Sequence, residues 1–401
     1  MVPAKAQTQP LFLTLPIGPA PSSERRALTA RVKQLAAESG LTVSSVTAAD
    51  SFPGLADHLE RHIAAGRIDG LDWFTRDRAA FSADPRNLQA SARSVLSVGV
   101  AYWSIDPGKP EDGVPRGRIS RYARGMDYHT LLKTRMRSLH ATIEAEVGRP
   151  VDARFLVDTA RIVDRAVAAR SGLGWYGKHA CIIVPGHGSW VLLGELLLDV
   201  ELESDAPLNR DCGRCTICLD RCPTGAIVAP YTIDTPRCLS FQTIEQRGPI
   251  PRSLRPSLGD WVYGCDVCQD VCPYTRAAVL EPDPALLPRS LNNAYPSLQW
   301  LLAMTEQEFR ETYRGTPVLR AKRRGLARNA AVALGNVGSD ADVPHLIDAL
   351  ETHDEPLVRG HAAWALGRLG GLRAIVALER CRTADPDESV REEIEAALSE
   401  P

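Results

Sequence analysis

The chain has 401 residues, of which 44% are hydrophobic and 24% are charged, and its formal net charge is −2. This composition supports a buried core and excludes an intrinsically disordered chain. A net charge so close to zero excludes a global basic field for nucleic acid, so any polyanion site must be local. The length predicts about two to three domains.

The N-terminal part of the sequence lacks the features of a targeting or membrane segment. Residues 1–21 contain a short apolar run but are interrupted by Pro16 and Pro19, so they lack the apolar core of a signal peptide. No run approaches the roughly 20 apolar residues of a membrane-spanning helix. We expect residues 1–23 to form a disordered N-terminal segment.

Helical and β patterns alternate over residues 24–205. Helices are predicted over Ser23–Ser39, Leu55–Gly66 and Tyr128–Val147. Strands are predicted over Leu41–Thr47, Ser94–Trp103, Arg154–Asp158, Ala180–Pro185 and Trp190–Leu198, the last two forming a hairpin-like pattern around a Gly-His-Gly turn. This alternation predicts an α+β or α/β catalytic domain over residues 24–205.

Eight of the ten cysteines lie between Cys212 and Cys272. Residues 212–223 read C-G-R-C-T-I-C-L-D-R-C-P, the C-x2-C-x2-C-x3-C-P spacing of bacterial ferredoxins that bind [4Fe–4S] clusters. Residues 265–273 read C-D-V-C-Q-D-V-C-P and carry three cysteines, with Cys238 upstream. In two-cluster ferredoxins the fourth cysteine of such a run binds the other cluster.

Crossing the fourth ligands in this way gives each of two clusters four thiolates. The first cluster is predicted to be bound by Cys212, Cys215, Cys218 and Cys272. The second cluster is predicted to be bound by Cys222, Cys238, Cys265 and Cys268. Zinc needs neither a third overlapping C-x2-C nor a trailing proline, and disulfides suit small secreted chains. We therefore expect a ferredoxin-like domain with two [4Fe–4S] clusters over residues 206–280.

The remaining two cysteines, Cys181 and Cys381, stand among apolar residues. We expect both to be buried, inert thiols.

The C-terminal part of the chain repeats itself after a proline-rich linker over residues 281–296. Ala333-Leu334-Gly335, Ala365-Leu366-Gly367 and Ala397-Leu398-Ser399 recur at a spacing of 32 residues. This pattern is typical of short HEAT-like helix pairs, which bury their apolar faces only by stacking. We expect HEAT-like helical repeats over residues 297–401.

Several longer motifs together identify a family. They are V-D-T-A from Val157, G-L-G-W-Y-G-K-H ending at His179, S-R-Y-A-R-G-M-D-Y-H ending at His129, C-P-T-G-A-I-V-A-P-Y from Cys222, and Cys238-Leu239-Ser240 followed by Gly248-Pro249-Ile250-Pro251. With the cysteine spacing, these motifs make residues 25–340 resemble the epoxyqueuosine reductases.

The resemblance implies a cobalamin-dependent oxidoreductase with two [4Fe–4S] clusters. Such an enzyme reduces epoxyqueuosine to queuosine at the wobble position of certain tRNAs, the last step of queuosine biosynthesis. Electrons would come from an external donor of the flavodoxin or ferredoxin type and pass through the clusters to cobalamin. Many members of the family carry a HEAT-like extension.

The resemblance also assigns site residues. Asp158 matches the acidic proton donor beside the cobalt, and Arg76, Arg121 and Ser240 fall in segments that resemble the cobalamin contacts. The chain departs from the family pattern after Asp158, because Arg161 and Asp164-Arg165 stand where the family commonly has Pro and Glu-Arg.

Two physical expectations follow for this chemistry. Opening the epoxide produces an alkoxide that a positioned acid must protonate, so we expect burial to raise the pKa of Asp158 from about 3.9. The D-x-H-x-x-G motif that gives cobalt a histidine is incomplete, because Leu132 follows Asp127 and His129 where Gly is needed. We therefore expect base-off cobalamin with no protein histidine on the cobalt.

Two basic stretches contain no acidic residue and are candidate tRNA contacts. Residues 312–339 carry six basic side chains, of which Arg320, Lys322, Arg323 and Arg324 are predicted to bind tRNA phosphates. Residues 114–126 carry Arg116, Arg118, Arg121 and Arg124. A solvated helix face is the alternative interpretation of each.

Together these patterns predict an α+β protein. Its parts would be a mixed α/β cobalamin-binding catalytic domain, a bacterial ferredoxin-like two-cluster domain and a C-terminal all-α HEAT-like domain. We expect a cytoplasmic monomer with no membrane association, because the clusters are oxygen-sensitive and no secretion signal is present. Two alternatives remain: a reductive dehalogenase-like enzyme acting on a small organic compound, and a zinc-stabilised binding protein, which would be colourless. The helical repeats and basic stretches favour tRNA.

Overall fold

The computed structural model describes residues 22–399, so the predicted disordered segment over residues 1–23 lies almost wholly outside the described residues. The chain divides into two compact units. The first contains the chain up to Ile105, Asp127–Thr235 and Val267–Leu286. The second contains Asp106–Met126, Pro236–Asp266 and the chain from Leu287 onward. The predicted domain boundaries stay predictions, because each unit combines segments of more than one predicted domain.

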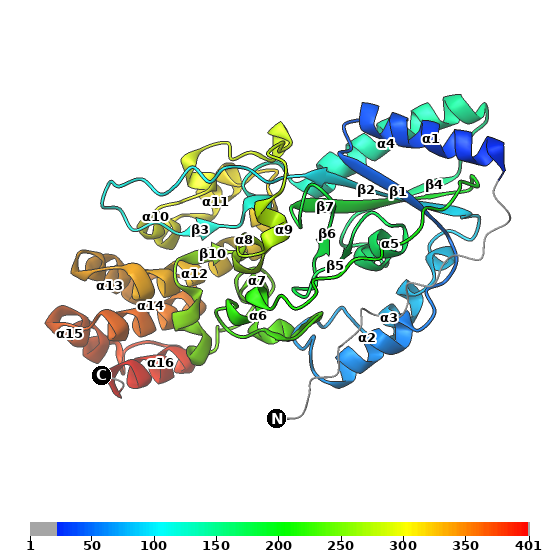
Figure 1. Cartoon of the computed structure of the whole chain (residues 1–401). Helices are drawn as coiled ribbons and strands as arrows, with labels where there is room; N and C mark the ends of the chain where they lie inside the picture. The colour runs from blue at the N-terminus through cyan, green and yellow to red at the C-terminus, as the bar shows by residue number, and fades with distance from the viewer. Residues whose placement is uncertain (1–21, 400–401) are drawn as a thin grey trace. The chain divides into compact units, whose positions relative to one another are not determined.

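The first unit is built on a four-stranded sheet in the order β1-β2-β7-β4. Its strands are β1 (Val43–Ala48), β2 (Ser94–Ala101), β7 (Val191–Leu198) and β4 (Ala153–Leu156), and every neighbouring pair is antiparallel. All eight residues of β2 are buried, as its mainly apolar, β-rich sequence predicts. Figure 1 shows helices α1 (Ser23–Glu38) and α4 (Tyr128–Val147) on one face of this sheet and α5 (Asp164–Arg170) on the other.

The other elements of the first unit are short. They are α2 (Leu55–Ala64), α3 (Arg76–Ser82), β5 (Trp175–Tyr176), β6 (Ile182–Ile183), α6 (Ile217–Asp220), β8 (Ile227–Ala229), β9 (Thr232–Ile233), α8 (Val267–Asp270) and α9 (Pro273–Arg276). The predicted helices over Ser23–Ser39, Leu55–Gly66 and Tyr128–Val147 are confirmed to within two residues at their ends.

The predicted hairpin around Gly186 is wrong in its pairing. Strand β6 pairs with β5, and β7 pairs with β2 and β4 instead of β6. A single bridge between Val184 and Gly188 closes the turn. Two adjacent β segments with a glycine turn predict a hairpin locally, but the longer β7 forms more hydrogen bonds in the central sheet.

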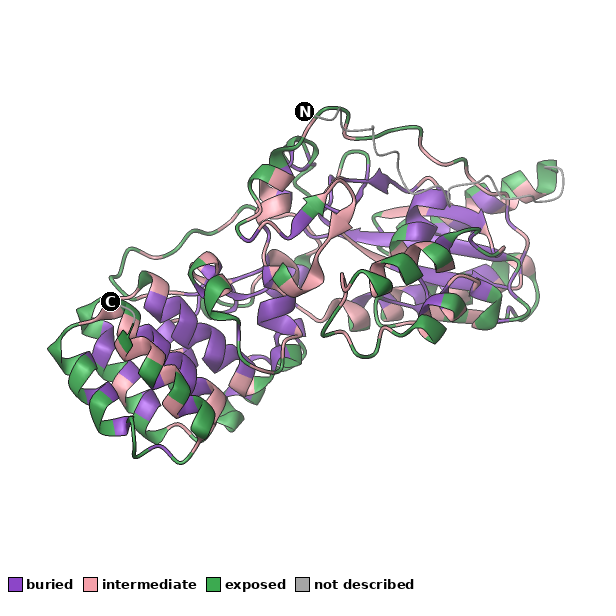
Figure 2. Cartoon of the chain, turned by 90° about the horizontal axis from the view of Figure 1, so that it is seen from below, coloured by how far each residue is buried: buried purple, intermediate pink, exposed green. Residues whose placement is uncertain are grey.

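The second unit combines two short segments from earlier in the chain with the C-terminal helices. Strand β3 (Arg118–Ile119) pairs in parallel with β10 (Trp261–Tyr263), and α7 (Leu239–Ile244) precedes β10. The C-terminal helices are α10 (Leu298–Ala303), α11 (Glu306–Thr312), α12 (Lys322–Val337), α13 (Val343–Thr352), α14 (Pro356–Leu369), α15 (Leu372–Cys381) and α16 (Glu388–Ser399). Figure 2 shows that the helices at the centre of this bundle are largely buried and that its rim is exposed.

The 32-residue repeat has a direct packing explanation. A Cβ atom on Gly335 of α12 would lie 2.9 Å from the Ala365 Cα of α14, and one on Gly367 of α14 would lie 3.1 Å from the Ala397 Cα of α16. The Ala-Leu-Gly motif therefore lets each helix approach the alanine of the next repeat closely. Ser399 replaces glycine in the last copy, where no described helix follows.

No helix among residues 22–399 is both long enough and apolar enough to span a lipid bilayer.

We predict that Gly367→Ala destabilises the helical repeats by about 1–3 kcal/mol, because the new methyl group overlaps the backbone of α16. Urea unfolding followed by circular dichroism measures the change. Gly360→Ala is the matched control in the same helix, since its Cβ would lie 3.4 Å from the flexible Glu393 side chain. Gly360→Ala should be neutral or stabilise by up to about 1 kcal/mol. Equal effects of the two substitutions would contradict the packing explanation.

Candidate functional site

Asp158 lies in the turn that follows β4 and has a backbone φ of +47°, in the left-handed region that residues other than glycine rarely adopt. It lines a cavity of about 400 Å³ in the first unit. Its lining includes four aromatic side chains, those of Trp73, Phe74, Tyr102 and Tyr128. It also includes the aliphatic side chains of Ile182, Val191, Leu192 and Leu193.

The start of α4 supplies hydrogen-bond partners for the Asp158 carboxylate. The Tyr128 hydroxyl donates to Asp158 Oδ2 at 2.9 Å, and His129 Nε2 lies 3.6 Å from the same oxygen. The other ring nitrogen of His129 lies 2.9 Å from Asp127 Oδ1. Burial disfavours the charged imidazole, but hydrogen bonds to Asp127 and Asp158 raise the pKa of His129 to about 9.

The sequence presents Asp127, Tyr128 and His129 as the end of a family motif and as an incomplete cobalamin motif, and it assigns none of them a position beside Asp158. In the structure Asp127 caps α4 through the backbone N–H of His129, and the next two side chains face Asp158. The sequence signal was the clustering of three polar residues at a helix start, which is commonly just a cap. Only the position of the β4 turn brings them to the acid.

The environment of Asp158 differs from the expected burial, because its side chain is 59% exposed. Two other carboxyls lie near the turn, those of the half-buried Asp164 and the buried Glu195. Asp164 Oδ1 accepts the Asp158 backbone N–H at 3.3 Å, and Asp164 in turn is a hydrogen-bonding neighbour of Glu195 on β7. The turn is also held by Arg78, which donates to the carbonyls of Thr159 at 3.2 Å and Ala160 at 2.8 Å.

The other predicted cobalamin contacts lie outside the residues that line this cavity. Arg76 is 66% exposed and forms an ion pair with Glu60 at 2.8 Å, whereas Arg78 from the same helix lines the cavity. Arg121 and Ser240 belong to the second unit. There the Arg121 backbone N–H donates to Asp266 at 2.8 Å, and Ser240 is half-buried on α7. These three contacts stay predictions.

The four cysteines predicted to bind the first cluster all belong to the first unit, and their ligand roles stay predictions. Cys218 interacts electrostatically with Cys212, Cys215 and Cys272, although Cys272 is far from the others in sequence. Cys272 belongs to a small apolar cluster with Trp175 and Ile183, and Cys212 packs against it. Burial and the neighbouring sulfurs raise the pKa of Cys218 to about 12 and raise that of Cys212.

This proximity fits an iron–sulfur cluster, because the neighbouring sulfurs disfavour the thiolates of Cys212 and Cys218 and cationic iron would reverse that effect. The described residues contain no group of three or more His, Cys, Asp or Glu placed around a single metal ion. All ten cysteines are free of disulfides.

The second predicted ligand set is divided between the units and stays a prediction. Cys222 and Cys268 belong to the first unit, and Cys238 and Cys265 to the second. Cys222 Sγ accepts the backbone N–H of Ala226 at 3.2 Å, the kind of hydrogen bond that stabilises a thiolate.

The two cysteines outside the cluster motif differ from each other. Cys381 is buried in α15, as expected. Cys181 is only partly buried and lines the cavity beside Asp158, so the expectation that it is buried is wrong. The bend between β5 and β6 turns its side chain to the cavity wall.

The arginines of residues 114–126 are neutralised by acids that lie elsewhere in the sequence. Arg116 pairs with Asp112 at 2.6 Å, Arg118 with Asp260 at 3.3 Å, and Arg124 with Asp106 at 3.3 Å. Arg124 is almost fully buried. Although this stretch contains no acidic residue, its arginines do not form an exposed basic surface.

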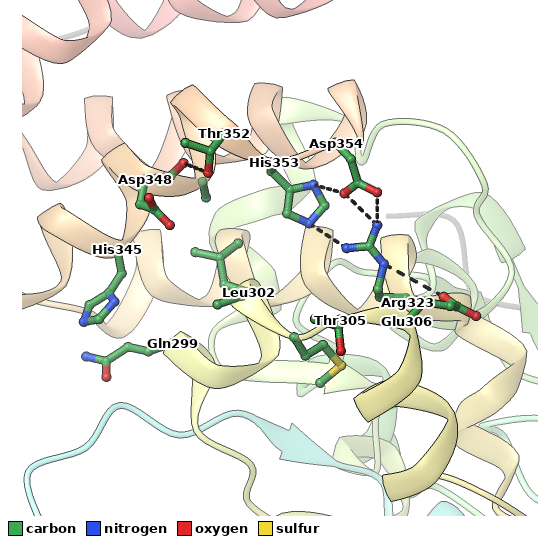
Figure 3. Close-up of a pocket in the computed structure, with 13 residues that line it drawn as sticks. Gln299, Leu302, Thr305, Glu306, Arg323, His345, Asp348, Thr352, His353 and Asp354 are labelled. Carbon is green, nitrogen blue, oxygen red and sulfur yellow. Dashed lines mark hydrogen bonds and ion pairs between the residues drawn. The ribbon is translucent and has the colours of Figure 1, made fainter.

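Residues 312–339 are also partly neutralised. Arg320 pairs with Glu245 at 3.1 Å, and Arg328 is buried and donates to the carbonyls of Gln242, Gln246 and Gly248. Figure 3 shows Arg323 enclosed by Glu306, His353 and Asp354, and its side chain is only 12% exposed.

Lys322 and Arg324 are the predicted phosphate contacts that make no ion pair with another described residue. Lys322 is exposed and Arg324 is half-buried. Both line a depression of about 700 Å³ on the second unit, together with Arg310 and Arg323.

Family models match three parts of the chain. The model described as "Epoxyqueuosine reductase QueG, DUF1730" matches residues 83–159. A 4Fe-4S double cluster binding domain matches residues 211–275, and HEAT repeats match residues 316–399.

Several proteins of known name are similar to the chain over most of its length. It is 38% identical to the epoxyqueuosine reductase of Xanthomonas campestris over 85% of this chain and 96% of that protein. It is 37% identical to the epoxyqueuosine reductase of Escherichia coli K12 over 85% of this chain and 89% of that protein.

Solved structures are similar in fold. A crystal structure of epoxyqueuosine reductase with an epoxyqueuosine-modified tRNA-Tyr stem loop has a TM-score of 0.87 and 31% identity, over 93% of this chain and 98% of that one. The Bacillus subtilis enzyme, solved with an aspartate-bearing catalytic loop swung out of the active site, has a TM-score of 0.86 and 31% identity, over the same shares. The expected fold class is confirmed.

We predict that Cys218→Ala lowers the iron content of anaerobically purified protein by about half, because one of two [4Fe–4S] clusters loses a ligand. Iron analysis and the visible absorption of the brown protein measure the loss. Cys381→Ser is the matched control, since Cys381 is a buried cysteine outside the cluster motif. An unchanged iron content in Cys218→Ala would exclude Cys218 as a ligand.

Proposed function

Because the chain belongs to the epoxyqueuosine reductase family, we propose that it reduces epoxyqueuosine in tRNA to queuosine. The observation that carries this proposal is the position of Asp158. This acid lines a cavity in the same unit as four converging cysteines and is hydrogen-bonded by Tyr128 beside a charged His129. An aspartate on a catalytic loop is also named for the Bacillus subtilis relative.

The reaction determines what the acid must do. Converting an epoxide to an alkene releases the oxygen as water and consumes two electrons and two protons. Both protons reach the same oxygen, so Asp158 must be protonated again after its first donation. Solvent can return this proton, because the Asp158 side chain is 59% exposed. His129, with its pKa raised to about 9 and its Nε2 3.6 Å from Asp158, keeps its own proton at neutral pH and stabilises the carboxylate between donations. The Tyr128 hydroxyl fixes the orientation of the carboxyl.

Electrons would enter through the cysteine-bound clusters, which transfer them one at a time. The first cluster would be held by Cys212, Cys215, Cys218 and Cys272. The second would be held by Cys222, Cys238, Cys265 and Cys268. An external one-electron donor of the flavodoxin or ferredoxin type would supply them.

The cavity beside Asp158 would take one edge of a corrin, because many of its lining side chains are apolar or aromatic, with polar groups such as Arg78, Arg165 and Gln269 among them. Cobalamin, when bound, supplies a metal centre that can store reducing power and attack carbon. Asp158, Arg76, Arg121 and Ser240 would hold it. Base-off binding without a protein ligand on cobalt remains the proposal, because Leu132 stands where the cobalt-ligand motif needs glycine. Nitrogen coupling from a protein histidine in the cobalt electron paramagnetic resonance spectrum would contradict this.

The tRNA would bind through phosphate contacts, and the modified base would be unstacked into the site, the usual mode of specific RNA recognition. A relative was solved with an epoxyqueuosine-modified tRNA stem loop. On this chain the basic residues Arg320, Lys322, Arg323 and Arg324 remain the proposed contacts. Lys322 and Arg324 should contribute most, because acids already pair with the other two.

We predict that Asp158→Asn lowers anaerobic turnover of epoxyqueuosine-containing tRNA at least about 100-fold, because an amide cannot donate the required proton. Iron content and cobalamin binding should be unchanged. Mass spectrometry of nucleosides from digested tRNA measures the product. Asp57→Asn, which changes an exposed aspartate of α2, is the control and should retain turnover. Undiminished turnover in Asp158→Asn would remove Asp158 from the proposed role.

We predict that Lys322→Glu with Arg324→Glu weakens binding of an epoxyqueuosine-modified tRNA stem loop about tenfold at low salt and flattens its salt dependence. Fluorescence anisotropy at several salt concentrations measures both effects. Arg368→Glu with Arg373→Glu is the control, because it makes the same charge change at two exposed positions of the last repeats. If both double variants lose affinity equally, this surface is not the specific contact.

A further inference from the structure

Glu195 is a carboxylic acid placed in an apolar layer of the central sheet. Its strand reads Val-Leu-Leu-Gly-Glu-Leu-Leu-Leu, and side chains alternate between the two faces. A Cβ on Gly194 would lie 3.6 Å from Met136 Sδ of α4, so Glu195 points to the opposite face. Leu193 and Leu197 share that face and pack in the apolar cluster beneath α5.

The Glu195 carboxyl is fully buried and lacks the partners that a buried carboxylate requires. Its exposed fraction is 0%, and neither oxygen accepts a hydrogen bond from an N–H or O–H group of the described residues. An unpaired ionised carboxylate is strongly disfavoured in such a place. The group is therefore expected to be stable only if it carries a proton.

Asp164, the first residue of α5, is the hydrogen-bonding neighbour of Glu195. Two carboxyl groups can form a hydrogen bond only when one of them is protonated. Burial raises the pKa of both groups. Asp164 raises the pKa of Glu195 further, whereas the hydrogen bond with Glu195 acts to lower the pKa of Asp164. The pair consequently holds one proton between α5 and β7.

The same Asp164 holds the catalytic turn from the other side. Its Oδ1 accepts the Asp158 backbone N–H at 3.3 Å, where Asp158 has its left-handed φ of +47°. A non-glycine residue keeps this conformation only when its surroundings hold it there. Glu195, Asp164 and the Asp158 backbone thus form a continuous chain from the sheet to the turn.

We propose that Glu195 and Asp164 are positioning residues for Asp158, and that the proton they share keeps the turn after β4 in its catalytic conformation. Protonated Glu195 donates to Asp164, which leaves an Asp164 oxygen free to accept the Asp158 N–H. The positions of the three groups are independent of the proposed function, whereas the effect on catalysis rests on the role of Asp158 in it.

The proposal predicts a dependence on pH. Removing the shared proton places two carboxylates side by side, so Asp164 moves away and releases the Asp158 N–H. The other ionisable groups that face the pair or Asp158 are His129 and Tyr128 from α4, Arg78 from α3, Arg165 from α5 and Tyr176 from β5. His129 also titrates at alkaline pH, so activity alone cannot report on the pair.

Amide hydrogen exchange over residues 157–163 is the decisive measurement, because it reports on the turn without cofactor or substrate. Glu195→Ala removes the donor to Asp164 and should raise exchange of this segment about tenfold over the wild type. Glu195→Gln keeps a donor at every pH and should leave exchange at neutral pH unchanged. Ser97→Ala is the matched control, because Ser97 lies directly opposite Glu195 in the ladder and its buried hydroxyl has no partner.

Amide exchange measured at alkaline pH distinguishes a pair that shares a proton from a single buried acid. As the pH rises, exchange of residues 157–163, corrected for its intrinsic rate, should increase in the wild type and stay constant in Glu195→Gln. Equal pH profiles of these two proteins would overturn the proposal. The comparison of the wild type with Glu195→Gln remains decisive even if Glu195→Ala does not fold, since glutamine preserves the size and hydrogen bonding of the side chain.

The pH dependence of thermal stability is a second test, and the direction of its change can be predicted. The folded pKa of Glu195 is raised above its ordinary 4.5, so its stabilising contribution is present below that value and is lost as the pH rises through the folded pKa. Glu195→Gln cannot lose a proton. Its Tm should therefore rise relative to the wild type with increasing pH, and a constant difference would contradict a shared proton.

Turnover measurements on the same variants test whether the conformation of the turn affects catalysis. Glu195→Ala should lower turnover about tenfold, and Glu195→Gln should restore it. If exchange behaves as expected but turnover does not follow, the positioning holds and the role of Asp158 fails. If Asp158→Asn is inactive but the Glu195 substitutions do not change amide exchange over residues 157–163, the proposed function stands and this inference fails.

Discussion

The pairing of β7 with both β2 and β4 is the constraint on which the candidate site depends. Register places Glu195 opposite Leu156, two residues before Asp158, so the acid of the sheet and the acid of the turn are fixed relative to each other. Helix α5 then begins at Asp164 and covers the same face. The Asp158 turn is consequently anchored to rigid backbone on one side and exposed to the cavity on the other. Such an arrangement suits a residue that must reach a substrate without losing its position.

The cysteines show a related dependence on distant contacts. Cys212, Cys215 and Cys218 are local to one loop and one short helix, but Cys272 comes from the N-terminus of α9. Their convergence puts thiols together in a partly apolar setting where ionisation is disfavoured without metal. Folding of this region and cluster assembly are therefore coupled, as is usual when ligands come from separate segments.

Charge in the second unit illustrates how sequence composition can mislead. Residues 114–126 and 312–339 carry many arginines and no acids, yet Asp106, Asp260, Glu245 and Asp354 neutralise most of them. Arg328 is buried, and its guanidinium donates hydrogen bonds to backbone carbonyls of α7 and of the segment that follows it. Several of these arginines stabilise the unit, which leaves a small basic area around Lys322 and Arg324.

The sequence by itself determined the family, the double-cluster cysteine motif and the helical repeats, and it singled out Asp158 as the candidate acid, because each is written in short spacings or in motifs of consecutive residues. It also placed α4 correctly, since apolar periodicity over twenty residues is a strong local signal. Only the tertiary structure decided that β6 pairs with β5, that Arg78 and not Arg76 lines the cavity, and that His129 and Glu195 lie near the Asp158 turn. These facts depend on strand register and on which faces of α3, α4 and α5 meet the sheet. Such long-range choices are set by the balance of burial over the whole unit, and no local pattern of residues records them.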